Sequence, residues 1–101
     1  MHFRYNPEKN ALLLRERGIG FDQIIEEIEN GKLLQITYHH NQTLYPKQKI
    51  FHVQCLDKVY LVPYIVESDG SIFLKTVYPS RKATKKLLTI SKEGHNESQS
   101  Q

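Results

Sequence analysis

The chain has 101 residues and a mass of 11.9 kDa, which fits one domain, because chains of this size rarely divide into two cores. Hydrophobic residues make up 39% of it, too many for a wholly disordered chain, yet no apolar run approaches the ~20 residues of a membrane span. The single cysteine, Cys55, excludes an internal disulfide framework and a zinc site built on several cysteines. Because no apolar secretory stretch lies near the N-terminus, we expect a cytoplasmic protein without a membrane partner.

Charge is distributed unevenly along the chain. Residues 1–31 carry four Lys or Arg and six Asp or Glu, a net charge of −2. Residues 32–92 carry ten Lys or Arg and three Asp or Glu, a net charge of +7. A basic segment of this kind attracts polyanions such as RNA, but lysines also keep a β-rich half soluble and protect its edges. Charge alone leaves both interpretations open.

The N-terminal third predicts two helices behind a short extended segment at residues 2–5. Asn6 is suited to cap the first helix, Pro7 fits its first position, and Gly18 fits its left-handed end. The second helix has one apolar stripe at the i, i+3, i+4, i+7 spacing, which comprises Phe21, Ile24, Ile25 and Ile28.

The following residues switch to the two-residue period of β-strands. The expected strands cover residues 34–38, 50–56, 59–66 and 72–78. In the first of them Leu34, Ile36 and Tyr38 alternate with polar residues, which predicts a half-buried strand. Pro63 lies inside the third and predicts a bulge or an N–H position that faces no neighbouring strand.

Together these elements predict an α+β domain over residues 1–90. A short N-terminal strand is followed by two helices packed on one face of a four-stranded antiparallel sheet. Ser80 is suited to cap a short C-terminal helix. Residues 91–101 are polar and are expected to form a disordered tail.

Three stretches of the chain resemble the BrnT-like toxins, a group of RelE-like toxins of bacterial type II toxin–antitoxin modules. Residues 3–10 and 15–22 are similar to the opening of that family, in which an aromatic-Asp-x-x-Lys-Asn start leads to a Lys-His-Gly-hydrophobic-Ser-Phe turn. A β-rich middle follows, and residues 78–86 resemble the family's Ser-Ala-Arg-Lys-Ala-Thr close. The family's Asp, His and Ser are replaced here by Asn6, Arg17 and Gly20.

The resemblance implies a RelE-like fold and a toxin that cleaves RNA without a metal or other cofactor and so inhibits translation. It also implies a cognate antitoxin that binds the toxin in a hetero-oligomer and holds it inactive. Such cleavage requires a base for the 2′-hydroxyl proton, cations for the phosphate and an acid for the leaving oxygen.

Tyrosine, histidine, lysine and arginine side chains can share these roles. Arg81 matches the arginine of the family's closing motif and is suited to bind a phosphate in bidentate fashion. The other candidate catalytic residues are Lys75, Tyr78 and His39. The candidate RNA-binding residues are Lys82, Lys85 and Lys86.

Each candidate also has a purely structural interpretation. Arg81 and the lysines fit a solvated surface, Tyr78 fits an ordinary core aromatic, and His39 fits a polar strand end. Together with His40 and His52, His39 could bind a metal, but no carboxylate or cysteine lies at ligand spacing, so we expect none. The alternative to a ribonuclease is a non-catalytic RNA- or protein-binding module with a basic sheet surface. Convergence of the candidate side chains and a histidine on one cleft would separate the two.

Overall fold

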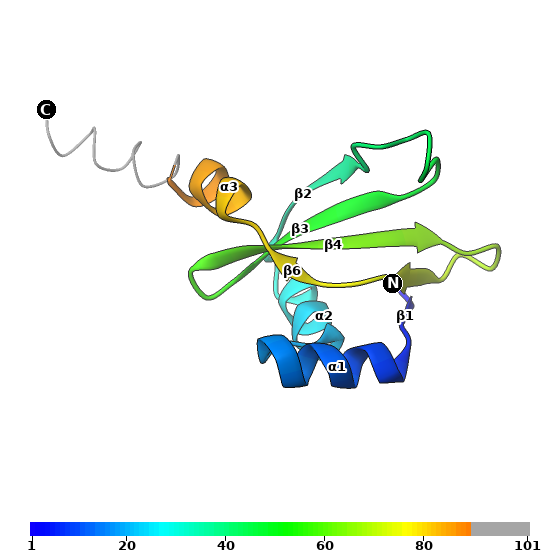
Figure 1. Ribbon diagram of the computed structural model, residues 1–101, viewed down its shortest axis with the longest axis horizontal. Helices are drawn as coiled ribbons and strands as arrows, with labels where there is room; N and C mark the ends of the chain where they lie inside the picture. Colours follow the sequence, from blue (N-terminus) through cyan, green and yellow to red (C-terminus); the bar gives the residue numbers. More distant parts are fainter. Residues whose placement is uncertain (90–101) are drawn as a thin grey trace, which may run out of the picture.

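The computed structural model describes residues 1–89 of the chain (Figure 1). Its elements are β1 (Phe3–Arg4), α1 (Pro7–Arg17), α2 (Phe21–Glu29), β2 (Leu33–Tyr38), β3 (Lys49–Cys55), β4 (Lys58–Val66), β5 (Ile72–Leu74), β6 (Tyr78–Pro79) and α3 (Arg81–Thr84). A turn of π-helix, Lys85–Thr89, continues α3. The expected tail at residues 91–101 lies outside the described residues. Within residues 1–89 no helix is long and apolar enough to cross a membrane.

The fold is α+β, with helices on both sides of one mixed sheet. Figure 1 shows α1 and α2 together on one side of the strands and α3 on the other. The sequence signals at the first helix are confirmed. The Asn6 side chain accepts a hydrogen bond from the backbone three residues on, and Gly18 ends α1 with a φ of 72°.

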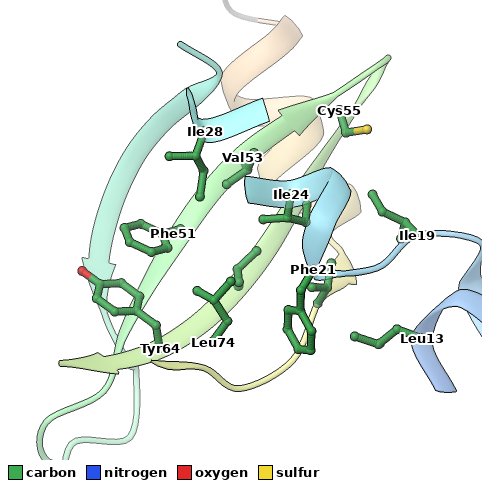
Figure 2. Close-up of a cluster of buried hydrophobic side chains, with 12 residues drawn as sticks. Leu13, Ile19, Phe21, Ile24, Ile28, Phe51, Val53, Cys55, Tyr64 and Leu74 are labelled. Carbon is green, nitrogen blue, oxygen red and sulfur yellow. The ribbon is translucent and has the colours of Figure 1, made fainter. Parts of the chain in front are cut away.

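The core lies between α2 and the central strands (Figure 2). Phe21, Ile24 and Ile28 of α2 are buried against the sheet, as their spacing predicts, and Ile25 is partly buried at the margin. On the sheet side, the rings of Phe51 and Tyr64 stack with centroids 3.9 Å apart. This apolar layer fixes the inner face of the sheet, and the face away from α1 and α2 is called the outer face below.

The expected four-stranded antiparallel sheet is only approximately right. The strand order is β1-β5-β4-β3-β2, with β6 also paired to β4, and β1 runs parallel to β5. The single strand expected over residues 72–78 is divided into β5 and β6. Both pair with β4, β6 at its start and β5 at its end.

Pro63 lies in β4 at the interval between these two pairings. Its carbonyl oxygen accepts a hydrogen bond from the backbone N–H of Lys75 at 2.8 Å. In a strand the N and O atoms of one residue point to the same side, so the missing N–H of Pro63 faces this interruption. The proline therefore lies where β4 has no regular ladder of hydrogen bonds that a missing N–H would interrupt.

The burial of β2 is the reverse of what its alternation predicts. Leu34, Ile36 and Tyr38 are 38%, 49% and 67% exposed, whereas Gln35 and Thr37 are half-buried. The reason is that β2 is an edge strand and α2 packs mainly on β3, so only Leu33 at the start of β2 reaches the core and the apolar residues after it stay exposed. Its polar residues face outward toward α3, where they help to form a pocket.

Candidate functional site

A pocket of about 250 Å³ lies between the outer face of the sheet and the C-terminal helix. Strands β2, β3 and β4 form its floor, and α3 with the following turn forms its wall. Its lining residues are Gln35, Thr37, His52, Leu61, Ser80, Lys82, Ala83, Lys86 and Leu87. It is called the His52 pocket here, because a buried histidine lies on its floor.

His52 is only 9% exposed, although it lies on the outer face. Its Nε2 atom lies 2.9 Å from Thr37 Oγ1, and its Nδ1 atom lies 3.4 Å from the amide nitrogen of Gln35. Because that amide nitrogen can only donate, Nδ1 accepts and the neutral ring donates its Nε2 proton to Thr37. Two residues of the edge strand therefore fix the orientation of the imidazole.

The surroundings of His52 favour its neutral form. Burial lowers the pKa of His52 from its usual 6.5, and the positive charge of Lys86 lowers it further. A histidine that is neutral at pH 7 can accept a proton from a bound hydroxyl. The site thus holds a base in the protonation state that proton abstraction requires.

Two lysines supply positive charge at the pocket. Lys82 and Lys86 are four residues apart, which places both on the side of the helix that faces the sheet. Among residues 1–89 the one ion pair joins Arg4 to Glu67 at 3.4 Å, so neither lysine is neutralised by a described carboxylate. No acidic side chain from the described part of the chain lines the pocket either. Its charge suits an anion such as a phosphodiester.

A second hollow of about 620 Å³ lies on the neighbouring side of α3. Arg81 and Lys85 line it, together with Asp57, Lys58 and Thr84. Pro79 and Ser80 complete its lining, and Ser80 also lines the His52 pocket. The basic residues expected from the sequence therefore form two stripes, Arg81 with Lys85 and Lys82 with Lys86, along adjoining hollows.

Tyr78 lies in the same row of the sheet as His52. The register places Tyr78 opposite Leu61, Leu61 opposite His52, and His52 opposite Gln35. Residues that face each other across neighbouring strands point to the same side of the sheet. Tyr78 is half-buried and belongs to the outer face, one strand beyond the pocket floor.

Two expected site residues lie elsewhere. Lys75 is exposed between β5 and β6, with its Nζ atom 5.6 Å from the ring centroid of Phe73. His39 follows β2, and its ring contacts those of His40 and Tyr45. Neither Lys75 nor His39 lines the His52 pocket. The histidine that lies beside the basic helix is His52, which the sequence suggested only as one of three possible metal ligands.

Gln35, Thr37 and His52 were not selected from the sequence as site residues. The available signal was a histidine between Phe51 and Val53 in a strand that is otherwise apolar at this point. Its partners come from another strand, so only the register reveals them. Within residues 1–89, no group of three or more His, Cys, Asp or Glu side chains is placed to hold a metal ion.

The arrangement combines a neutral imidazole, a phenol in the same row and four basic side chains along one short helix. These groups can hold a phosphodiester and move protons beside it. No family model, no curated protein and no solved structure matches the chain.

Proposed function

We propose that the protein is a ribonuclease toxin of a type II toxin–antitoxin module and binds its RNA across the His52 pocket. The observation that carries the proposal is a buried histidine that stays neutral beside two lysines. Neither lysine pairs with a carboxylate among residues 1–89. The sequence resemblance supports the same reading, and so does the net charge of the segment that forms the sheet and α3. A cognate antitoxin is the proposed partner that holds the toxin inactive.

The proposed reaction uses the 2′-hydroxyl of the RNA as its own nucleophile. His52 takes the 2′-hydroxyl proton on Nδ1, where the hydroxyl replaces the long 3.4 Å contact from the Gln35 amide, as the 2′-oxygen attacks phosphorus. Lys82 and Lys86 stabilise the charge on the phosphate oxygens. The bond from phosphorus to the 5′-oxygen breaks, and Tyr78 donates a proton to that leaving oxygen. The products are a 2′,3′-cyclic phosphate and a 5′-hydroxyl. Arg81 binds a neighbouring phosphate from the second hollow.

Replacement of His52 by Gln tests the proposal directly. Glutamine keeps a polar side chain near Thr37 but cannot accept the proton, so the cleavage rate of single-stranded RNA should fall about 100-fold or more. The matched control is His2→Gln, because His2 lies at β1 and bonds to Ser71, away from the pocket. Circular dichroism checks that both variants fold. An unchanged rate in His52→Gln would contradict the assignment.

The pH profile of kcat/KM gives a second, independent readout. Cleavage should decline as pH falls through the depressed pKa of His52, which places the acidic limb below pH 6.5. Lys86→Gln removes a charge that lowers this pKa, so the limb should move to higher pH. Lys9→Gln, on α1 at the other side of the sheet, should leave the limb where it is. If the acidic limb has the same position in Lys86→Gln as in the wild type, His52 is not the titrating base.

Expression in bacteria tests the toxin itself. The wild-type chain should slow growth and lower bulk translation, His52→Gln should do neither, and co-expression of the antitoxin should restore growth. RNA binding without cleavage at any pH would instead favour the alternative, a non-catalytic RNA-binding module. Absence of both RNA binding and cleavage would refute the ribonuclease and the RNA-binding module and would leave the protein-binding module as the alternative.

A further inference from the structure

Three aromatic side chains gather in the loop between β2 and β3, apart from the His52 pocket. The rings of His39 and His40 stack with centroids 4.5 Å apart at 23°, and the ring of Tyr45 lies 4.4 Å from that of His39. His40 is exposed and Tyr45 is 42% exposed. The group is called the aromatic platform below. Exposed stacked rings offer a surface on which further planar groups can stack.

Hydrogen bonds of the loop hold the platform in place. Asn41 organises it: its backbone N–H donates to His39 Nδ1 at 3.0 Å, its carbonyl oxygen accepts from Tyr45 N at 2.9 Å, and its side-chain oxygen accepts from Leu44 N at 3.0 Å. Gln48 closes the loop by accepting from the backbone N–H of His39 at 2.9 Å. The rings are therefore positioned before any ligand arrives, which lowers the entropy cost of binding.

The platform lies on the same face of the sheet as the His52 pocket. Gln35 and Thr37 of β2 point outward, and two residues further along the alternation brings His39 to that face. A strand rises about 3.3 Å per residue, so Gln35 and His39 are about 13 Å apart along β2. Figure 1 shows α3 and the β2–β3 loop toward opposite ends of these strands. A ligand that reaches both must be extended.

The charge of this region also points to a polyanion. From residue 30 to residue 56 the chain contains no aspartate or glutamate, and Lys47 lies in the β2–β3 loop two residues after Tyr45. Single-stranded nucleic acid is an extended anion that carries planar groups. Bases in a duplex are stacked on each other and cannot stack on protein rings, whereas unpaired bases can.

We infer that the aromatic platform stacks unpaired bases of the substrate, so that the protein selects single-stranded RNA. This inference rests on the proposed function for the identity of the ligand. The phosphates lie along Lys82 and Lys86, and the bases beyond the pocket reach the rings of His40 and Tyr45. The His52 pocket supplies charge and proton transfer, and the platform supplies a preference for exposed bases.

The test compares two oligomers of equal length and charge by fluorescence anisotropy. One is a 2′-O-methyl RNA, which has no 2′-hydroxyl to be attacked, and the other is an abasic sugar–phosphate chain. Tyr45→Leu should weaken binding of the 2′-O-methyl RNA roughly 5- to 100-fold and leave binding of the abasic chain unchanged. Tyr45→Phe, which keeps the ring, should bind like the wild type.

The matched control is Tyr38→Leu, because Tyr38 is an exposed tyrosine on the inner side of β2, the face opposite the platform. It should leave both affinities unchanged. A duplex of the 2′-O-methyl RNA should bind more weakly than the single strand, and Tyr45→Leu should not affect that binding. Equal losses for the two oligomers, equal affinity for the duplex, or no effect of Tyr45→Leu would each overturn the inference.

Variants of the two pocket lysines distinguish a failure of this inference from a failure of the proposed function. Lys82→Gln and Lys86→Gln should each weaken both oligomers and reduce the slope of log K against log salt by about 0.7. If the lysine variants lose binding while Tyr45→Leu does not, the platform fails and the proposed function stands. If the wild-type chain binds neither oligomer, both fail.

Discussion

The position of His52 shows how one side chain can be polar, buried and outside the apolar core at once. Its two neighbours in sequence, Phe51 and Val53, point into the core, and the imidazole points to the other side of the sheet. Thr37 and Gln35 from the edge strand satisfy its nitrogens, which removes much of the cost of burying them. The ring remains neutral because a charged one would be poorly solvated there.

This environment predicts a pH dependence of stability. In the unfolded chain His52 titrates near 6.5, but in the folded chain its pKa is lower. Between the two pKa values the unfolded chain binds a proton that the folded chain does not, so stability falls as pH decreases below about 7. The loss continues down to the folded-state pKa and then levels off.

Urea denaturation of the wild type and of His52→Gln from pH 7.5 to pH 4.5 measures this effect. The difference in free energy of unfolding between the two should shrink as the pH falls, because only the wild type carries the penalty. Parallel stability curves would mean that the folded-state pKa of His52 is not depressed.

At the scale of elements, the corner between α1 and α2 depends on a close approach. Gly20 precedes α2 and has no side chain to cap it, and the side chain of Asn10 performs this role by accepting from Phe21 N at 2.7 Å. A Cβ atom on Gly20 would overlap Asn10 Oδ1 and would lie 3.0 Å from Leu14 Cγ. Glycine is required here by space, since its φ of −125° suits any residue.

Gly20→Ala should therefore lower the free energy of unfolding by about 1–3 kcal/mol. The alanine methyl group forces Asn10 aside and breaks the cap as well as crowding Leu14. In an Asn10→Ala background the same substitution should cost less, because the cap and the oxygen that clashes are already gone. A double-mutant cycle by urea denaturation measures the coupling. Strictly additive effects would indicate that the two side chains do not compete for this space.

The helices could be predicted from the sequence because their signals are local. Asn6 and Gly18 act within one turn of the residues they cap, and the stripe on α2 is read from spacing alone. The strands were located well, but their relations were not. The reversed burial of β2 and the division of the strand at residues 72–78 both depend on which strands become neighbours.

The same distinction applies to the candidate site. Lys82, Lys85, Lys86 and Arg81 form a local run of basic residues, and they do lie together along two hollows. His52 meets them only because β3 lies under α3, which no local pattern contains. His39 was the more visible histidine because it ends a clear strand. A sequence thus reveals the charged rim of such a site more readily than its floor.

At the scale of the whole molecule, charge is divided between the two sides of the sheet. Four acidic residues lie on α2 on the inner side, namely Asp22, Glu26, Glu27 and Glu29. The basic residues of α3 lie on the outer side with the His52 pocket. A polyanion approaching the molecule is therefore drawn to the outer face and repelled from the helical layer. This orientation would bring RNA to the face that carries both proposed contact regions.

The parallel pair of β1 and β5 joins distant parts of the chain. Phe3 lies opposite Ile72, the backbone N–H of Ile72 donates to His2 O at 2.8 Å, and the side chains of His2 and Ser71 meet at 2.9 Å. Strands β2, β3 and β4, by contrast, follow one another through hairpin connections. Local contacts form early in folding and distant ones late.

We expect Phe3→Ala to accelerate unfolding with little change in the folding rate, because β1 docks after the main transition state. Val53→Ala, in the central hairpin, should slow folding instead. Stopped-flow kinetics over a range of urea concentrations separates the two rates. A slower folding phase in Phe3→Ala would place β1 in the nucleus and reverse this order.

The late docking of β1 also bears on synthesis of the chain in the cell. Nearly seventy residues must be added after Phe3 before its partner Ile72 exists. At about 5–20 residues per second this takes roughly 3 to 14 seconds, longer than helices and hairpins need to form. During that interval Phe3 and Arg4 have no β5 to pair with. The nascent chain therefore carries an incomplete sheet edge until residue 72 has left the ribosome, and chaperones would meet it in that state.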